Sequence, residues 1–436
     1  MGQTVSIFWL RRDLRLEDNI GLNQALKGNS PVLPIIIFDK EILDQLTEND
    51  ARVTFIHKTI QDLSVHLIKN YNSSIAMFSG SPVEVFSALT TNYSIEAVYA
   101  NHDYEPYALE RDTEIKNLLN AKNIPFYTYK DHVVFEKDEI VKSDGNPYVV
   151  FTPYKNKWKE KFKATIHLRS LENDSNISNF IPNTQLPFLE LADLGFEPSA
   201  IKIPDYIISN TFFENYEATR NYPALTNGTS RIGPHLRFGT VSIRKIMKQA
   251  IAVDNEIFWN ELIWREFFIQ ILWHFPKTVN HAFKPEYDGI TWRNRKTEFE
   301  KWTMGQTGYP LVDAGMRELN QTGFMHNRVR MLTASFLCKH LLIDWRWGEA
   351  YFAEKLLDFE LSSNVGNWQW AAGSGVDAAP YFRIFNPTTQ VEKFDRQKEY
   401  INTWVPEFQE FTYAEKIVDH NYARNRCLKV YKEALG

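Results

Sequence analysis

The sequence of 436 residues predicts an α/β domain followed by a larger helical domain. At the start of the chain, short apolar runs alternate with segments of helical spacing, as strands and helices do when they follow one another. This alternation is lost from about residue 133 to residue 205. Ten of the 12 tryptophans then fall between Trp259 and Trp404, which indicates a helical part with an aromatic core. The chain also exceeds the usual size of one hydrophobic core.

The first part contains four apolar runs with the length of buried strands, at residues 4–10, 30–39, 73–80 and 95–101, and two segments of helical spacing, at residues 51–70 and 105–123. Strands that alternate with helices form a parallel sheet with right-handed crossovers. No G-x-G-x-x-G follows any of these strands, so the usual dinucleotide-binding fingerprint is absent. The first strand leads instead into a charged loop, RRDLRLEDN, at the carboxyl edge of the sheet.

A polar stretch separates the two parts of the chain. SLENDSNISNFIPNTQLP, residues 170–187, is rich in Asn, Ser and Pro, which is typical of a long connection rather than a packed element. No repeat of fixed period is visible, so a solenoid is not expected. The sequence therefore predicts an α/β domain over residues 1–132, a connector over 133–205, and a helical domain over 206–436.

Composition limits the location and the partners. Two cysteines, Cys338 and Cys427, argue against a disulfide framework and for a reducing compartment, so we expect a cytoplasmic protein, near the nucleoid if the source is bacterial. MGQTVSIFWLRRDLR reaches arginines too soon for a signal peptide, and no uncharged run could span a bilayer, so no membrane partner is expected. A net charge of -5 does not suggest a nucleic-acid partner, but a local basic face would still permit one.

The first motif with chemical meaning is NGTSRIGPHLRFGTVSIRKIMKQ, residues 227–249. Thr229 and Ser230 are residue types that begin helices, and Gly228 and Gly233 let a ligand approach the backbone. A helix N-terminus with hydroxyls nearby is a natural phosphate site. An ordinary capped helix with a solvated basic face explains the same pattern, so both interpretations stay open on this motif alone.

The second motif is FWNELIWREFFIQILWHFP, residues 258–276, which predicts a helix buried on nearly all sides. Glu261 and Arg265 are four residues apart and share one face, with Trp264 beside them. A carboxylate within an aromatic helix needs a partner. Either Glu261 and Arg265 satisfy each other, or both are reserved for a ligand.

The third motif runs from residue 323 to residue 387. Arg328 and Arg330 precede one apolar helix, and Asp358 and Glu360 end the next. Arginine suits two-pronged binding of carboxylates and phosphates. Then NVGNWQWAAGSGVDAAPYFRIFNP sets two tryptophans among three glycines, which fits either an aromatic core plug or flat rings that stack on a flavin or an unstacked base.

Together the motifs resemble the photolyase/cryptochrome family, and bacterial class I cyclobutane pyrimidine dimer photolyases in particular. FWLRRDLRLEDN, GTSRIG, NELIWREFF, GQTGYPLVDAGMREL, TGFMHNRVRM, SNVGNWQWAAGSGVDAAPYFRIFNP and KFD occur in the order typical of that family. The resemblance covers almost the whole chain and is densest from residue 216 to about residue 400. It implies a Rossmann-like antenna domain, a connector, and an all-helical domain that holds FAD in a U-shaped conformation.

The resemblance also implies roles for residues. Residues that would hold FAD are Tyr216, Thr229, Ser230, Arg231, Ile232, Gly233, Arg330, Asp358, Phe359, Glu360 and Asn364, with Arg330 paired to Asp358 and Asn364 beside flavin N5. Residues that would meet the lesion or the DNA are Glu261, Trp264, Arg265, Phe268, Asn327, Arg328, Met331 and Trp370. Catalytic residues would be Glu261 and Asn364 at the reaction centre and the electron path Trp368, Trp345 and Trp292. No metal site is expected.

Two features depart from the family pattern or leave it open. Asp358-Phe359-Glu360 stands where members often have Asp-Gly-Asp, and we expect the backbone to stay helical there. An antenna pigment, methenyltetrahydrofolate or a deazaflavin, is an unproven possibility, with Asn101 and Glu105 near the position that contacts a folate in some members.

The function implied is light-driven repair of cyclobutane pyrimidine dimers, in which reduced anionic FAD passes an electron to a flipped-out dimer in damaged DNA, by a protein expected to be a monomer. A (6-4) photolyase is an alternative, but that branch carries paired histidines, whereas Asn327 follows His326 and Met331 stands at the second position. A cryptochrome photoreceptor is another, although many have a longer tail beyond the position of Gly436, and plant members tend to have Asp at the Asn364 position. A generic flavoprotein oxidoreductase is disfavoured, because no nicotinamide fingerprint appears.

Overall fold

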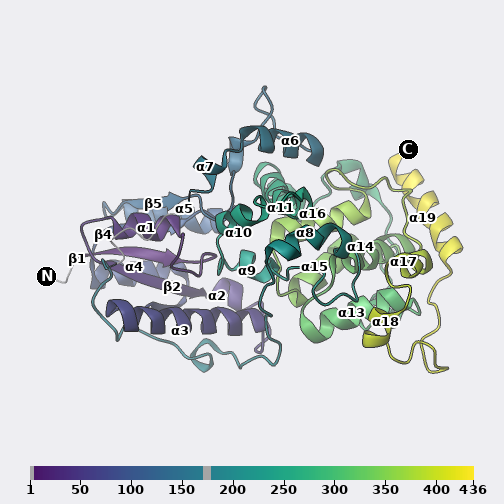
Figure 1. Ribbon diagram of the computed structural model, residues 1–436, viewed down its shortest axis with the longest axis horizontal. Coiled ribbons are helices and arrows are strands. Elements are labelled where there is room, and N and C mark those ends of the chain that lie inside the picture. Colours follow the sequence, from purple (N-terminus) through teal and green to yellow (C-terminus); the bar gives the residue numbers. More distant parts are fainter. Residues whose placement is uncertain (1–3, 170–177) are drawn as a thin grey trace. The chain divides into compact units, whose positions relative to one another are not determined.

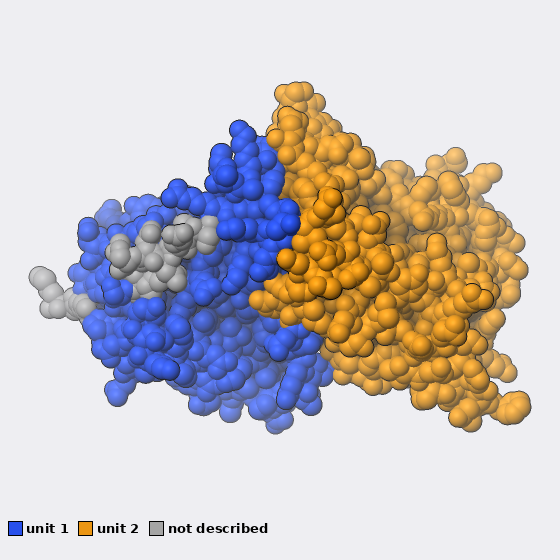
Figure 2. Space-filling view, in the orientation of Figure 1, with its two compact units in different colours: residues 1–136, 161–205, 232–252 blue, residues 137–160, 206–231, 253–436 orange. Residues whose placement is uncertain are grey.

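The computed structural model describes residues 4–169 and 178–436, and these fall into two compact units, coloured separately in Figure 2. Unit 1 comprises residues 1–136, 161–205 and 232–252, and unit 2 comprises residues 137–160, 206–231 and 253–436. The predicted domain boundaries, after residues 132 and 205, remain a prediction. The two compact units differ from them, because each unit is built from three separate stretches of the chain. The first part of the predicted polar connection, residues 170–177, lies outside the described residues.

Unit 1 is built on a parallel sheet in the order β3-β2-β1-β4-β5, as the strand-helix alternation predicts. Its strands are β1 (Thr4–Leu10), β2 (Val32–Asp39), β3 (Ala76–Gly80), β4 (Ser94–Asn101) and β5 (Phe126–Tyr129). Its helical segments are α1 (Ile20–Leu26), α2 (Lys40–Leu43), α3 (Ala51–Tyr71), α4 (Pro82–Asn92), α5 (Pro106–Asn120), α7 (Ala164–His167), η2 (Ala192–Leu194), α9 (Gly233–Arg237) and α10 (Ile243–Ala250). The strand order reverses direction between β1 and β4, so their carboxyl ends border the crevice where α/β sheets usually bind ligands.

The helices cover both faces of the sheet, and β1 shows why (Figure 1). Phe8 and Leu10 belong to a core shared with Ile60 of α3, whereas Ile7 and Trp9 belong to a core shared with Phe86 of α4. Side chains alternate between the two faces along a strand. A strand that is apolar at every position is therefore buried on both sides, which is the signature of a parallel sheet.

Unit 2 is helical. Its elements are η1 (Lys137–Glu139), α6 (Phe151–Lys161), α8 (Asn210–Thr219), α11 (Glu256–His274), η3 (Pro276–Val279), η4 (Pro285–Gly289), α12 (Lys296–Thr303), α13 (Pro310–Thr322), α14 (Asn327–Ser335), the π-helix η5 (Phe336–His340), α15 (Trp345–Lys355), α16 (Leu361–Ala372), α17 (Pro387–Phe394), α18 (Glu399–Trp404) and α19 (His420–Leu435). The largest core joins α13 to α16 around Trp302, Trp345 and Trp368.

Helix α6 lies inside the segment that the sequence predicts to be a connector. Phe151, Tyr154 and Trp158 are its buried residues, and the indole N–H of Trp158 donates a hydrogen bond to Glu266 of α11 at 2.7 Å. The helix was not expected because its remaining residues are polar. Among the described residues, no helix is both long and apolar enough to cross a membrane, and no group of three or more His, Cys, Asp or Glu side chains could hold a metal ion.

Candidate functional site

Unit 2 contains a cavity of about 610 Å³ that is open to solvent. It is bounded by α14, α15, α16 and the turn between the last two helices. Its lining residues are Asn327, Arg330, Met331, Ala334, Phe352, Leu356, Asp358, Phe359, Glu360, Ser363, Asn364, Asn367, Trp368, Trp370 and Ala371. Nine of these were predicted as site residues from the sequence, although they come from separate motifs.

The acidic turn at one side of the cavity is held by arginines. Arg330 donates to both carboxylate oxygens of Asp358, at 3.1 and 3.0 Å, so the predicted pair is confirmed. Arg265 of α11 donates to Glu360 at 2.9 Å. The alternative in which Arg265 pairs with Glu261 is therefore wrong, because Arg265 reaches a carboxylate at the start of α16.

The expectation of a helical backbone at Asp358-Phe359-Glu360 is also wrong. Helix α15 ends at Lys355 and α16 begins at Leu361, so the three residues form the turn between them. The N–H of Leu357 donates to the carbonyl of Gly323 at 2.9 Å, which ties this turn to another loop instead of continuing a helix. In the turn, the ring of Phe359 contributes an apolar part of the cavity wall.

Asn364, in the first turn of α16, is held by a partner that no motif indicates. Its side-chain amide donates to the carbonyl oxygen of Glu349 at 3.0 Å and to the Glu349 carboxylate at 2.8 Å. Burial raises the pKa of Glu349, and the hydrogen bond from Asn364 opposes this. Glu349 therefore fixes the orientation of the Asn364 amide at the cavity wall, and nothing in the spacing of α15 predicts this role.

Glu261 does not line the cavity. It forms an ion pair with Arg220, whose guanidinium lies 5.5 Å from the ring centre of Tyr216. Burial raises the pKa of Glu261, while the charge and hydrogen bond of Arg220 lower it. Tyr216, Arg220 and Glu261 thus form a polar cluster of their own, and Arg220 is a partner that sequence reasoning missed.

Phe268 is buried in unit 2, and Trp264 is partly buried. Trp264 stacks on Phe151 with ring centres 3.6 Å apart and planes at 8°. Phe268 is 5% exposed and lies against Gly366 of α16, where an added Cβ would come within 2.2 Å of its ring. Gly366 is thus required for close packing of α11 on α16. Of the aromatic residues predicted for a lesion pocket, Trp370 lines the cavity, whereas Trp264 and Phe268 do not.

The segment Thr229–Gly233 does not form the capped helix that the sequence predicts. Helix α9 begins at Gly233, spans only five residues, and follows Ile232 without any side-chain cap. Ser230 is buried, and Arg231 has a positive φ of 53°. The hydroxyls of Thr229 and Ser230 therefore belong to the turn before the helix, because Pro234 near the helix start and the sharp bend at Arg231 shift its beginning.

Helix α14 carries four predicted residues, Asn327, Arg328, Arg330 and Met331, from one capped start. The Nδ1 atom of His326 accepts a hydrogen bond from the N–H of Arg328 at 3.1 Å. This cap directs Asn327 and Met331 to the cavity wall. Arg328 itself donates to Asn221 and lies 4.3 Å from the ring centre of Phe394, outside the cavity. Burial lowers the pKa of Arg328, and Arg220 and Arg383 lower it further, so positive charge gathers here.

The three tryptophans of the predicted electron path are all in unit 2. Trp368 and Trp345 are buried, and Trp292 is partly buried. Within the described residues, Trp345 has no stacking or edge contact with Trp368 or Trp292; the ring beside Trp368 is instead Trp302. The path remains a prediction.

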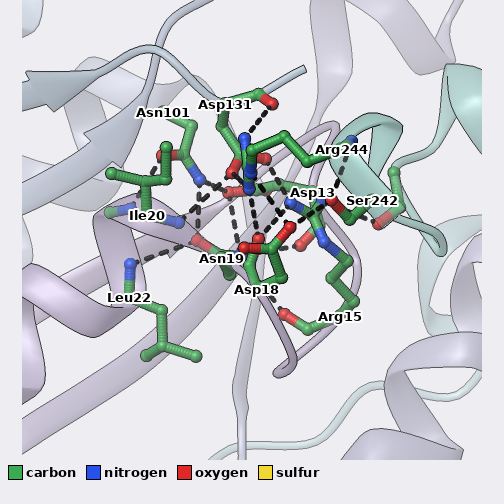
Figure 3. A network of polar contacts seen from close by, with 12 residues as sticks. Asp13, Arg15, Asp18, Asn19, Ile20, Leu22, Asn101, Asp131, Ser242 and Arg244 are labelled. Carbon is green, nitrogen blue, oxygen red and sulfur yellow. Dashed lines mark hydrogen bonds and ion pairs between the residues drawn. The ribbon is translucent and has the colours of Figure 1, made fainter. Parts of the chain in front are cut away.

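The two residues considered for an antenna pigment are bonded within unit 1. The Asn101 side chain donates to Asp13 and to Asn19 and accepts from the N–H of Gly21 (Figure 3). Glu105 accepts from Arg12 at 3.2 Å and from Arg237 at 3.0 Å. A folate contact there stays a prediction, and it would have to exchange these bonds.

The same network ties α10 to the sheet (Figure 3). Arg244 donates to Asp18 and Asp131, each at 2.9 Å, and Arg15 donates to Asp131 at 2.7 Å. Burial raises the pKa of Asp131, but Arg15 and Arg244 outweigh it and bring the pKa to about 2. Paired charges of this kind fix α10 in place, and losing one partner would leave a buried charge without a counter-charge.

Glu318 of α13 is a buried carboxylate that the sequence motifs do not explain. It is 8% exposed, accepts from the Tyr400 hydroxyl at 2.5 Å and accepts from the N–H of His326. Burial raises its pKa from 4.5 to about 7, against the effect of these hydrogen bonds. Between pH 4.5 and about 7, Glu318 keeps its proton in the folded chain but loses it in the unfolded chain. The resulting stabilisation is lost as the pH rises through about 7.

We expect Glu318→Gln to remove that pH dependence. Because Gln keeps an acceptor oxygen without a charge, the free energy of unfolding should rise by up to about 3 kcal/mol at pH 8 and change little at pH 5. Urea unfolding followed by tryptophan fluorescence at both pH values measures the difference. Glu399→Gln, at an exposed carboxylate, is the control. An equal effect of Glu318→Gln at both pH values would contradict the assignment.

Comparison with known proteins agrees along the whole chain. A sequence model of DNA photolyase matches residues 6–172, and a model of the FAD binding domain of DNA photolyase matches residues 258–412. Relatives named deoxyribodipyrimidine photo-lyase include one from a Synechococcus strain, 34% identical with 98% of this chain and 96% of the relative covered. Another, from Escherichia coli, is 33% identical with 99% of each covered.

Solved structures give the same result. The bacterial class III photolyase from Agrobacterium tumefaciens is 31% identical, with a TM-score of 0.86 over 100% of this chain and 98% of that one. The archaeal photolyase from Sulfolobus tokodaii, described with two FAD molecules, is 33% identical, with a TM-score of 0.83 over 98% and 100%. Because such relatives match over nearly its full length, the chain belongs to the DNA photolyase family and carries that family's FAD-binding domain.

Proposed function

We propose that the chain repairs cyclobutane pyrimidine dimers in DNA with light. The observation that carries the proposal is the cavity in unit 2, whose wall brings together predicted flavin and lesion residues from separate motifs. The names of the relatives support the substrate, since deoxyribodipyrimidine photo-lyases act on pyrimidine dimers in DNA. Membership of class I remains part of the proposal, because one of the similar solved structures, from Agrobacterium tumefaciens, is of a class III photolyase.

The residues of the cavity fit FAD. The cavity is open to solvent, and Trp368 and Phe359 offer the flat apolar surface that is typical of ligand pockets. Asn364 supplies an oriented amide, and the Arg330–Asp358 pair supplies polar groups at the same wall. Tyr216 and the Thr229–Gly233 turn would hold the phosphates. These residues would hold FAD, which in its reduced anionic form would supply light-driven one-electron chemistry for opening the cyclobutane ring.

The remaining residues would receive the dimer. Trp370 and Met331 give the cavity wall an aromatic face and a soft apolar face, which suit two linked pyrimidines displaced from the stack. Flipping costs unstacking energy, and this cost is lower at a damaged step, which favours the lesion over intact DNA. Glu261, anchored by Arg220, would place a carboxyl group near the base edges.

Repair under controlled light tests the proposal. Purified holoprotein with chemically reduced flavin is mixed with an oligonucleotide that carries one thymine dimer, and the repaired product is separated by chromatography after measured doses of blue light. We expect repair in light, none in darkness, and none of a (6-4) lesion. A protein that binds flavin and DNA but repairs no dimers would instead support the cryptochrome alternative.

Flavin retention should depend on the turn at Thr229 and Ser230. Replacing both with Leu removes two hydroxyls and crowds a turn in which Ser230 is buried, so we expect largely flavin-free protein. The ratio of flavin to protein absorbance of the purified variant measures this, with far-UV circular dichroism as the test of folding. Folded protein with full flavin content would exclude the turn from the cofactor site.

Binding to DNA should be salt-dependent and should need Arg328. A cation that neutralises a phosphate releases counterions, so affinity falls as salt rises. Arg328→Ala should weaken damaged and undamaged DNA alike and reduce the salt slope by about 1. Fluorescence anisotropy over a salt series measures both quantities. Lys429→Ala, at an exposed cation of α19, is the matched control. An equal loss of DNA affinity in both variants would show that Arg328 does not contact the DNA.

A further inference from the structure

Helix α16 lines the cavity with two rows of side chains. Asn364 and Trp368 are four residues apart and form a buried row. Asn367 and Trp370 are three residues apart and form a second row, in which Asn367 is exposed and Trp370 is partly exposed. The second row therefore lies on the solvent side of the cavity wall, from which a base displaced from DNA would enter.

The side-chain amide of Asn367 is oriented by its own helix. Its nitrogen donates to the carbonyl oxygen of Ser363, four residues earlier, at 2.8 Å. Turning the amide over would bring two oxygens together, so this orientation is favoured. Among the residues that the structure describes, the amide oxygen of Asn367 has no hydrogen-bond partner. Asn367 therefore adds an oriented acceptor to the cavity wall, on the same row as Trp370.

The charged groups of the same wall are bound to each other. Glu360 accepts from Arg265 at 2.9 Å, and Asp358 accepts from Arg330 through both carboxylate oxygens. Asn367 differs from these groups because its acceptor is neutral and unoccupied. A neutral acceptor does not repel the phosphates of DNA, and it favours a ligand with an N–H group at the facing edge.

Pyrimidine bases differ in the group at ring position 3. Thymine and uracil have an N3–H donor between two carbonyl oxygens, whereas cytosine has an acceptor at N3 and its donor on the exocyclic amine. An acceptor held in one orientation distinguishes these bases, because the wrong base leaves it unpaired. Trp370 is flat and would contact the face of a ring, so Asn367 on the same row is suited to the edge of a base.

We propose that Asn367 binds the displaced dimer, and that its amide oxygen accepts a hydrogen bond from the N3–H of one thymine. The contact rests on the proposed function, since it names the base edge that the repair site recognises. It favours dimers of thymine or uracil over dimers with cytosine at that place. Asn367 is thus a lesion-binding residue, and its loss weakens binding of the dimer without changing the repair of dimers that are bound.

Binding in darkness tests the contact separately from repair. Holoprotein carrying Asn367→Ala is titrated by fluorescence anisotropy with four oligonucleotides: an undamaged one, one with a thymine dimer, and two in which that dimer is methylated at N3 of its 5′ or its 3′ base. Asn402→Ala, at an exposed position of α18, is the control. Alanine suits both helices, and flavin content and far-UV circular dichroism check the fold. Repair per absorbed photon is then measured at saturating DNA.

We expect Asn367→Ala to bind the dimer about 3- to 10-fold more weakly than the parent protein, as loss of one hydrogen bond predicts. Its affinity for undamaged DNA and its repair yield at saturation should not change, and Asn402→Ala should match the parent protein throughout. One of the two methylated dimers should bind Asn367→Ala and the parent protein equally, and this identifies the thymine that Asn367 contacts.

Two results would overturn the contact: equal binding of the thymine dimer by Asn367→Ala and the parent protein, or a loss that persists with both methylated dimers. A loss of the same size in Asn402→Ala would also overturn it. A parent protein that shows the expected binding pattern but repairs no dimers would instead overturn the proposed repair function and leave the contact in place.

Discussion

Trp368→Phe should abolish light-driven reduction of oxidised flavin, while protein reduced beforehand still repairs dimers. Trp368 is the tryptophan of the predicted path that lines the cavity wall. Phenylalanine is far harder to oxidise than tryptophan, so the proposed path through Trp345 and Trp292 cannot deliver an electron through position 368. In the proposed cycle the electron returns after each repair, so protein reduced beforehand does not need this delivery.

The substitution should be tolerated by the fold. Trp368 is 2% exposed and packs on Phe352 and Gly348, so a smaller ring leaves a cavity that costs about 1 to 2 kcal/mol of stability. Flavin content and thermal unfolding check this cost before any photochemistry. Reduction rate and repair yield are then compared under equal light dose. Normal photoreduction in the variant would show that electrons bypass position 368.

The sequence predicted the sheet because the physics of strands is local. A mostly apolar run such as β1 predicts a strand buried on both faces from the sequence alone, and the fold has that strand. Strand β5 escaped prediction because its four residues, Phe126–Tyr129, are too few to show a pattern. Helix α6 did show one, since Phe151, Tyr154 and Trp158 recur at helical spacing, but the polar residues between them concealed it.

The residues of the site could be predicted from motifs, but the ion pairs between them could not. Arg265 lies four residues from Glu261 and yet binds Glu360, 95 residues later, while Glu261 binds Arg220, 41 residues earlier. Helical spacing only permits an ion pair, and the tertiary fold decides between competing partners. Glu349 illustrates the same limit, because it orients Asn364 through a contact between two different helices.

At the turn around Phe359, the motif predicted the charged residues correctly and the backbone conformation wrongly. The charges of Asp358 and Glu360 are retained and both are bound by arginine. The backbone was expected to stay helical across these residues, and it forms a turn instead. A turn results because α16 has to start with its first residues at the cavity, and Asn364 then reaches Glu349 from its first turn.

Asn364→Asp should reduce repair per absorbed photon to roughly a tenth or less, because it removes a positioned donor from the proposed reaction centre. The Asn364 amide donates to the Glu349 carboxylate at 2.8 Å. Aspartate has no proton to donate when ionised, and two carboxylates at this distance repel each other strongly when both are charged. They would share one proton or repel each other, and either result turns the side chain away from its present orientation.

The pH dependence distinguishes this explanation from simple misfolding. The pKa of Glu349 is already raised by burial, so the pair of carboxyl groups that Asn364→Asp creates should keep a proton at low pH and lose stability as the pH rises, by about 3 kcal/mol once both are ionised. Repair yield, the visible spectrum under illumination and urea unfolding are measured from pH 5 to pH 8. Asn402→Asp, at an exposed position of α18 away from the cavity, is the control and should show no such slope. Equal repair by Asn364→Asp and the parent protein at every pH would remove Asn364 from the reaction centre, since a side chain that acts there cannot exchange an amide for a charge without effect.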